Sequence, residues 1–97
     1  MSYYFHPAAE AEHYETIGFY ESRQVGLGLM YLNELEKVMD IVVHAPQRYR
    51  IERKTNIRCV SLNQFPFKII FRDAGEVVQV LAIAHKRRRP DYWLNRL

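Results

Sequence analysis

Residues 26–46 read GLGLMYLNELEKVMDIVVHAP, and this stretch decides how the rest of the chain is interpreted. Small and apolar residues recur there at spacings of three and four, namely Gly28, Tyr31, Leu35, Val38, Val42 and Ala45. This spacing places them along one stripe of an α-helix, which suits packing against another helix or a sheet. Pro46 cannot continue a helix. The stretch therefore predicts a helix over residues 27–44.

The residues before this helix predict a second one. Pro7 stands where proline is favoured, at the first position of a helix. Residues 8–23 contain no proline and are rich in Ala and Glu, which favours a helix. Its expected packing stripe is Ala11, Tyr14 and Gly18, together with the neighbourhood of Ile17 and Glu21. Glycine costs about 1 kcal/mol relative to alanine inside a helix, so we expect a second helix to approach closely at Gly18.

Two further patterns complete the N-terminal half. The short aromatic run Tyr3–His6 has the length and composition of a strand. The connection Val25–Gly28 is short and contains glycine, which indicates that the two helices form an antiparallel hairpin.

The residues after Pro46 have strand character. Tyr49 and Arg50 are expected in a loop. Three segments then mix β-branched, aromatic and polar residues over strand lengths, namely 57–62, 65–71 and 77–84, and residues 73–76 supply a turn between the last two. The order is one strand, two helices and three strands (β-α-α-β-β-β). The sequence thus predicts a single α+β domain over residues 1–97, with a helical hairpin on one face of an antiparallel sheet.

Composition excludes several classes of protein. The chain has 97 residues, of which 48% are hydrophobic and 26% are charged, as in a globular domain. It has neither a transmembrane run nor a secretory start, so no membrane partner is expected. Cys59 is the only cysteine, which fits a reducing, cytoplasmic compartment and a small buried side chain. No cofactor and no metal are expected, because the four glycines form no phosphate-binding loop and the histidines lack ligand spacing.

Charge is unevenly distributed along the chain. Residues 1–45 carry two cations and seven acids, whereas residues 46–97 carry twelve cations and four acids. This asymmetry suggests an acidic partner for the second half, either nucleic acid or an acidic polypeptide. The alternative is a fold with two differently charged faces and no such partner. The densest cluster is Lys86-Arg87-Arg88-Arg89, within a basic and aromatic tail at residues 85–97.

An ordered set of motifs resembles the RelE/ParE superfamily of bacterial toxins. The motifs are Pro7-Ala8-Ala9-Glu10, Phe19-Tyr20-Glu21, Gly26-Leu27-Gly28, Ala45-Pro46, Phe65-Pro66-Phe67-Lys68-Ile69 and the tail from Ala84 to Trp93. The resemblance runs over nearly the whole chain. It implies the same α+β fold and the toxin of a type II toxin–antitoxin module, which inhibits growth, stabilises plasmids and is neutralised by a cognate antitoxin protein.

The resemblance is closer to the ParE branch, whose members inhibit DNA gyrase by binding. Phe65-Pro66-Phe67 and the tail from His85 to Trp93 resemble elements that mark this branch. The alternative is a RelE-like endoribonuclease that cuts mRNA in the ribosome. For that branch the resemblance carries over cations at Lys68 and Arg87, but Trp93 stands near the position of the proton-transferring tyrosine. The resemblance therefore implies a binding toxin rather than an enzyme.

Cleavage of RNA needs a base, an acid and cations near the phosphate. Lys54, Arg58, Lys68, Arg72 and Arg87 supply candidate cations, and His85 is the candidate base. Their ordinary alternative is that the cations face solvent on a half-buried sheet and that His85 is structural. If the chain is a ribonuclease, the catalytic set is Lys68, His85 and Arg87.

For a binding toxin, the candidate contacts to the target or partner are Lys68, Arg87, Arg88, Arg89, Tyr92 and Trp93. We expect the segment from His85 to Trp93 to be needed for toxicity but not for the fold, with Tyr92 and Trp93 packing the tail onto the sheet. Apolar residues in excess of one small core predict that an antitoxin docks as an amphipathic helix or an added strand.

Overall fold

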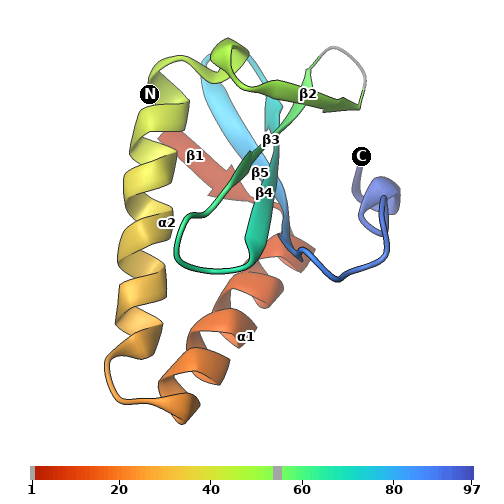
Figure 1. The fold of residues 1–97 in the computed structure, drawn as a ribbon. Coiled ribbons are helices and arrows are strands. Elements are labelled where there is room, and N and C mark those ends of the chain that lie inside the picture. The colour runs from red at the N-terminus through yellow and green to blue at the C-terminus, as the bar shows by residue number, and fades with distance from the viewer. Residues whose placement is uncertain (1, 54–55) are drawn as a thin grey trace.

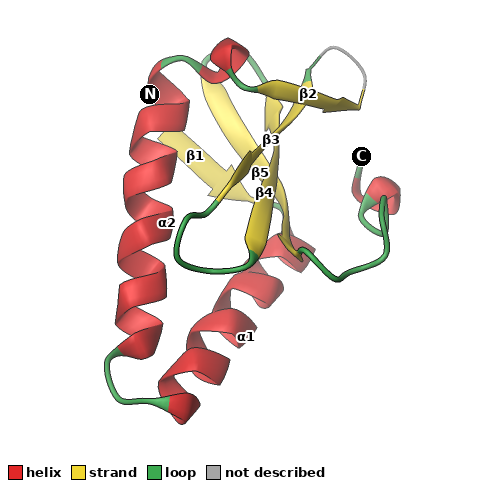
Figure 2. Cartoon of the chain, viewed as in Figure 1, coloured by secondary structure: helices red, strands yellow, loops and turns green. Residues whose placement is uncertain are grey.

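The computed structural model describes residues 2–53 and 56–97. Two long helices and a twisted sheet make up most of the chain (Figures 1 and 2). The elements in chain order are β1 (Ser2–Phe5), α1 (Pro7–Arg23), α2 (Leu27–His44), a 3₁₀ turn at Pro46–Arg48, β2 (Arg50–Arg53), β3 (Ile57–Ser61), β4 (Phe67–Asp73), β5 (Val77–His85) and a 3₁₀ turn at Leu94–Arg96. The predicted α+β fold and both helices are confirmed.

The sheet has five strands in the order β1-β5-β4-β3-β2. The predicted meander is present, since β3, β4 and β5 pair in antiparallel fashion. Two features go beyond the prediction. Strand β1 pairs in parallel with β5, with Ser2 opposite Val77. Arg50, expected in a loop, begins the edge strand β2, which pairs with β3.

The two faces of the sheet carry separate clusters of buried side chains. The hairpin of α1 and α2 covers one face, where Leu35 and Met39 of α2 pack with Ile69 and Phe71 of β4. The other face carries a smaller cluster that includes Ile57, Leu81 and, from the tail, Trp93. The tail therefore covers part of the face that the helices leave open. None of the described helices is long and apolar enough to cross a membrane.

The buried stripe of α2 largely follows the predicted spacing. Gly28, Tyr31, Leu35 and Val42 are buried, and Met39 joins them. The predicted stripe of α1 was right at Ile17, which packs against the core, and at Glu21, which contacts Gly28, but wrong at its other three residues. Ala11, Tyr14 and Gly18 are exposed, and α1 buries Ala9, His13 and Thr16 instead. Helix α1 has apolar residues on both faces, so composition alone did not indicate which face packs.

Close approach in the hairpin occurs at Gly28, not at Gly18. A Cβ at position 28 would lie 2.6 Å from the carbonyl oxygen of Ile17, whereas nothing lies within 4 Å of one at position 18. The Glu21 carboxylate accepts hydrogen bonds from the backbone N–H groups of Gly26 and Gly28. Gly26 has φ of 89°, a left-handed conformation that favours glycine. Together these contacts fix the connection between α1 and α2 and the close packing of the two helices there.

Candidate functional site

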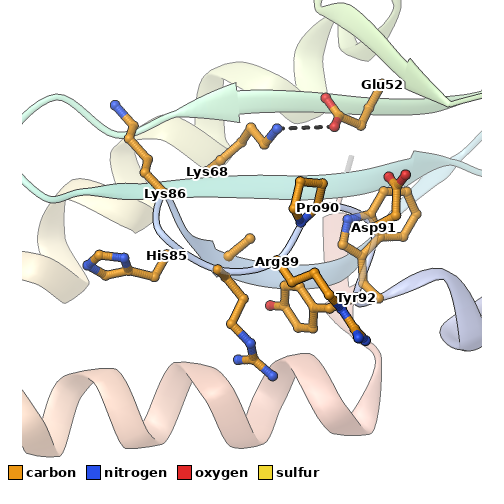
Figure 3. A pocket seen from close by; sticks show the side chains of 11 residues that line it. Glu52, Lys68, His85, Lys86, Arg89, Pro90, Asp91 and Tyr92 are labelled. Carbon is orange, nitrogen blue, oxygen red and sulfur yellow. Dashed lines mark hydrogen bonds and ion pairs between the residues drawn. The ribbon is translucent and has the colours of Figure 1, made fainter.

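A pocket of about 290 Å³ lies between the open face of the sheet and the tail. We call it the tail pocket (Figure 3). Glu52 of β2, Lys68 of β4 and Ala84 of β5 line it on the sheet side. The tail side is lined by His85, Lys86, Arg88, Arg89, Pro90, Asp91, Tyr92 and Trp93. The pocket thus gathers four cations and two carboxylates.

The cations of the tail project from a turn that backbone contacts hold in place. We call Lys86–Arg89 the basic turn. The N–H of Lys86 donates to the carbonyl of Pro66 at 2.9 Å, which ties the turn to the loop before β4. The N–H of Arg88 donates to the carbonyl of His85 at 2.9 Å. The N–H of Arg87 donates to Nδ1 of His85 at 3.0 Å.

Trp93 anchors the tail in the second cluster of buried side chains. It is only 2% exposed and packs with Ile57, Ile70 and Leu81. Burying an aromatic side chain of this size stabilises a fold by several kcal/mol. The expectation that the whole segment from His85 to Trp93 is dispensable for the fold is therefore wrong at Trp93. The expected packing of the aromatic pair onto the sheet is observed.

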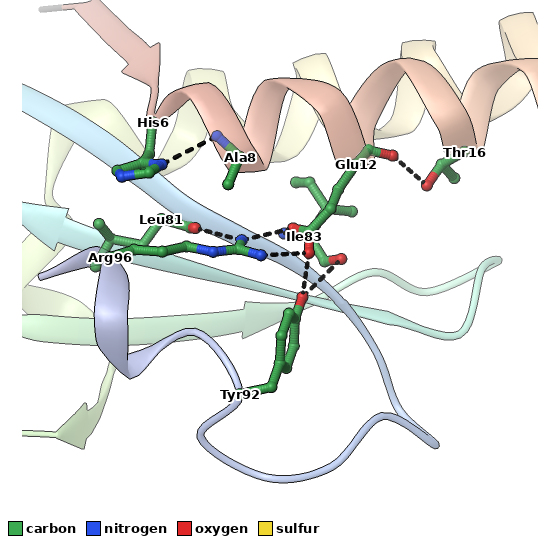
Figure 4. A network of polar contacts seen from close by, with 8 residues as sticks. All are labelled: His6, Ala8, Glu12, Thr16, Leu81, Ile83, Tyr92 and Arg96. Carbon is green, nitrogen blue, oxygen red and sulfur yellow. Dashed lines mark hydrogen bonds and ion pairs between the residues drawn. The ribbon is translucent and has the colours of Figure 1, made fainter.

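A second anchor joins the tail to α1 through Glu12. Its carboxylate accepts hydrogen bonds from Tyr92 Oη at 2.8 Å, from both terminal nitrogens of Arg96 at 2.9 Å and from the N–H of Ile83 at 3.0 Å. Arg96 also donates to the carbonyl of Leu81. We call Glu12, Tyr92 and Arg96 the clasp (Figure 4).

The clasp takes the place of a neighbouring strand beside β5. Strand β1 pairs with β5 only as far as Val80, and the next backbone groups on β5 bond to clasp side chains. Leu81 is the extra residue of a bulge, because Val80 pairs with Phe71 and Ala82 pairs with Ile70. The clasp thus satisfies polar backbone groups that would otherwise lack partners at the end of β1.

Electrostatics in the clasp favour an ionised Glu12 and a neutral Tyr92. Burial on its own raises the pKa of Glu12, but the hydrogen bonds from Arg96 and Tyr92 outweigh it and lower the pKa below its usual range. Burial, followed by the hydrogen bond to Glu12, raises the pKa of Tyr92. The phenol therefore holds its proton tightly.

Both carboxylates of the tail pocket are paired with cations. Lys68 Nζ lies 3.1 Å from a Glu52 oxygen, and Arg53 lies 2.7 Å from an Asp91 oxygen. Burial raises the pKa of Glu52, but the hydrogen bonds from Lys68 and Cys59 and the charges of Lys68 and Arg50 together outweigh it, so the pKa is lowered overall. Among the residues that the structure describes, no ion pair involves Lys86, Arg87, Arg88 or Arg89. The basic turn is therefore the unneutralised part of the site.

Comparison with known proteins assigns the chain to a family. A model described as "ParE toxin of type II toxin-antitoxin system, parDE" matches residues 3–90. The chain belongs to this ParE toxin family. The fold of this ParE family member is also similar to a chain of a solved structure, described as "Chromosomal ParDE TA system from P. aeruginosa". The two are 19% identical with a TM-score of 0.71, over 88% of this chain and 95% of that one. No curated protein matches the sequence.

The ParE family member gathers the predicted site residues around the tail pocket. Lys68, His85, Arg88, Arg89, Tyr92 and Trp93 line it, and Arg87 lies exposed in the basic turn. Other predicted cations lie elsewhere. Arg58 donates to the carbonyl of Tyr49, Arg72 lies near the far end of β4, and Lys54 is outside the described residues. Cys59 is buried, as expected.

Two of the predicted catalytic groups, the candidate base His85 and the candidate cation Lys68, are already engaged by neighbouring groups. Nδ1 of His85 accepts the N–H of Arg87, so Nε2 of the neutral ring carries the proton. His85 in this arrangement has no free lone pair with which to act as a base. Lys68 is held by Glu52. The arrangement is suited to binding anions through the basic turn.

Glu12, Glu52 and Arg96 of this ParE family member are site residues that the sequence did not predict. Glu12 is one of four glutamates on α1, and it meets Arg96 across 84 positions of sequence. No local spacing marks such a pair. The structure describes no group of three or more His, Cys, Asp or Glu side chains suited to a metal within residues 2–53 and 56–97.

Proposed function

We propose that the chain is a type II toxin that inhibits DNA gyrase by binding it and is neutralised by a cognate antitoxin. The family match over residues 3–90 carries this proposal. The basic turn, held rigidly at one end of the sheet, is the surface proposed to contact the target. Lys68 lies at the base of the same pocket, beside the tail.

The state of the candidate catalytic groups supports binding rather than cleavage. Trp93 is buried, Tyr92 keeps its proton and donates a hydrogen bond to Glu12, and His85 uses its Nδ1 lone pair within the turn. General acid–base catalysis requires groups that can exchange protons with the substrate. The proposed toxin therefore acts through contact with its target.

The outer surface of the hairpin supports an antitoxin partner. Large apolar side chains are exposed along it and at its tip, namely Tyr14, Phe19, Val25, Leu29, Met30 and Ile41. Exposed apolar side chains in this number are typical of a protein that has a docking partner. An amphipathic helix would cover these side chains, and the outer edges of β1 and β2 offer backbone groups to an added strand.

Parallel assays of gyrase and translation test the target. We expect the purified chain to block supercoiling by gyrase and to leave cell-free translation unchanged. The variant with Arg87→Ala, Arg88→Ala and Arg89→Ala should lose this inhibition. Cleavage of mRNA in the translation reaction, with normal supercoiling, would instead establish the ribonuclease alternative, for which the cations of the tail pocket are the supporting observation.

A further inference from the structure

The basic turn has the features of a site for a polyanion. Its four consecutive cations are exposed, and none of them pairs with a carboxylate among the described residues. The acids that line the same pocket, Glu52 and Asp91, are already paired with Lys68 and Arg53. Repulsion among adjacent cations is unfavourable for the free chain, and a bound anion relieves it.

The cations extend beyond the turn across the open face of the sheet. Arg50 and Arg53 on the edge strand β2 have side chains that are 72% and 50% exposed, and each also pairs with a carboxylate, Arg50 with Glu52 and Arg53 with Asp91. The ion pair between Arg53 and Asp91 places this strand beside the tail. The sheet-side wall of the tail pocket thus connects the basic turn to further cations. A surface of this kind fits an extended chain of negative charges better than one isolated carboxylate.

The aromatic side chains of the tail are not available to stack on bases. Trp93 is buried. The guanidinium groups of Arg88 and Arg96 lie over the ring of Tyr92, at 4.0 and 5.1 Å from its centroid. Proteins that bind single strands usually rely on exposed aromatic stacking in addition to cations. The tail offers cations alone, which suits contact with the phosphates of a duplex.

We infer that the basic turn binds the phosphate backbone of duplex DNA, without reading its sequence. This inference rests on the proposed function, because a toxin that acts on gyrase meets an enzyme engaged with duplex DNA. Duplex DNA also has a higher linear charge density than a single strand, with about one charge per 1.7 Å of axis. The preformed turn reduces the ordering cost of binding, since contacts from Pro66 and His85 already hold its backbone.

Fluorescence anisotropy with a short labelled duplex, in the absence of gyrase, tests the inference. The variant Arg87→Ala/Arg89→Ala is compared with Arg23→Ala/Lys37→Ala, which removes the same charge from exposed positions on the hairpin. We expect the tail variant to bind the duplex about tenfold more weakly at low salt. Its affinity should also depend less steeply on salt, with the magnitude of the slope of log affinity against log salt reduced by about two. The hairpin variant should bind like the unmodified chain.

Competitors identify the ligand chemistry. A single strand of equal length should compete less well than the duplex, and polyglutamate of equal charge should compete poorly. Equal loss of affinity in the two charge-matched variants would overturn the inference, because net charge alone would then explain binding. Strong competition by polyglutamate would overturn it in favour of an acidic polypeptide.

The supercoiling assay separates this inference from the proposed function. Inhibition of gyrase by a chain that does not bind the duplex would overturn the inference and leave the proposed function standing. Binding of the duplex through the basic turn, with no effect on supercoiling, would support the DNA site and contradict gyrase as the target.

Discussion

Gly28 and Gly18 both lie inside helices, but substitution by alanine should have opposite effects on stability at the two positions, because only Gly28 is closely packed. We expect Gly28→Ala to destabilise the fold by about 2 kcal/mol, because the new Cβ would collide with the carbonyl oxygen of Ile17 at 2.6 Å. We expect Gly18→Ala to stabilise it by up to about 1 kcal/mol, since the position is open and alanine favours the helix.

Thermal unfolding of the two glycine variants provides the measurement. A change of 1 kcal/mol shifts the midpoint by about 4–8 °C in a domain of this size. The two midpoints should therefore move in opposite directions from that of the unmodified chain. An equal decrease in both variants would mean that the helices do not pack as described.

His13 makes stability depend on pH. It is buried among aromatic rings, and its Nδ1 lies 3.0 Å from Tyr31 Oη. Burial lowers its pKa below the ordinary value of 6.5. Below pH 6.5 the unfolded chain takes up a proton that the folded chain excludes, so the free energy of unfolding should fall as pH falls until it reaches the folded pKa. Above pH 6.5 this contribution is complete.

Urea unfolding between pH 5 and pH 7.5 measures the effect of His13. Each unit of difference between the folded and unfolded pKa values of His13 contributes about 1.4 kcal/mol to the free energy of unfolding. His13→Gln keeps a polar partner for Tyr31 and should flatten the pH profile over this range. A variant that retains the full slope would assign the pH dependence to another group.

The contacts of the clasp residues could not be predicted from the sequence. Hydrophobic spacing indicated the buried side of α2, because that helix is apolar on one stripe. It was only partly informative for α1, and it contained no sign that Glu12 would meet Arg96. Such a pair depends on how the tail folds back, which is a long-range property of the chain.

At the scale of elements, the tail combines an anchor and an exposed turn. Trp93→Ala should lower the free energy of unfolding by about 3–5 kcal/mol, because it empties a site in the second cluster of buried side chains. Arg87→Ala/Arg88→Ala/Arg89→Ala should change unfolding by only about 0.5 kcal/mol per position. The triple variant should nevertheless lose most of its inhibition of bacterial growth.

Urea unfolding and growth curves at matched expression separate these two roles. A marked loss of stability in the triple variant would show that the basic turn is structural. Full toxicity of the triple variant at equal expression would place the active surface elsewhere, either around Lys68 or on the hairpin.

Strand β2 was missed for a physical reason. Three of its four residues, Arg50–Arg53, are charged and only Ile51 is apolar, so the segment resembles a solvated loop. The segment becomes a strand because β3 offers it backbone partners, and edge strands often carry charge. The strands of the meander were predictable because their apolar residues must be buried.

At the scale of the whole molecule, the exposed hairpin predicts a partner. Co-expression with the adjacent reading frame should allow both chains to be purified together. Tyr14→Glu and Phe19→Glu should weaken this association without unfolding the chain, because both side chains are exposed on α1. Ser22→Glu adds the same charge to the same helix at an exposed polar position and serves as the control.

Affinity purification and circular dichroism give the readouts for the partner. Recovery of a lone, stable and non-toxic chain from the co-expression would contradict the prediction. Equal recovery of the partner with Tyr14→Glu, Phe19→Glu and Ser22→Glu would place the docking surface away from α1. The sheet edges would then be the remaining candidates among the described elements.

The pairing of the first strand with the last governs when this chain can fold during synthesis. Ser2 and Val77 are separated by 75 positions, yet they lie opposite one another in β1 and β5. Contacts between such distant residues slow folding, because the ends must be brought together before the contacts form. On the ribosome, β1 emerges long before its partner exists. The sheet therefore closes only when β5 has been made, and the basic turn follows immediately behind it. A nascent chain therefore acquires its complete sheet and its charged surface together, once β5 and the basic turn behind it have been made.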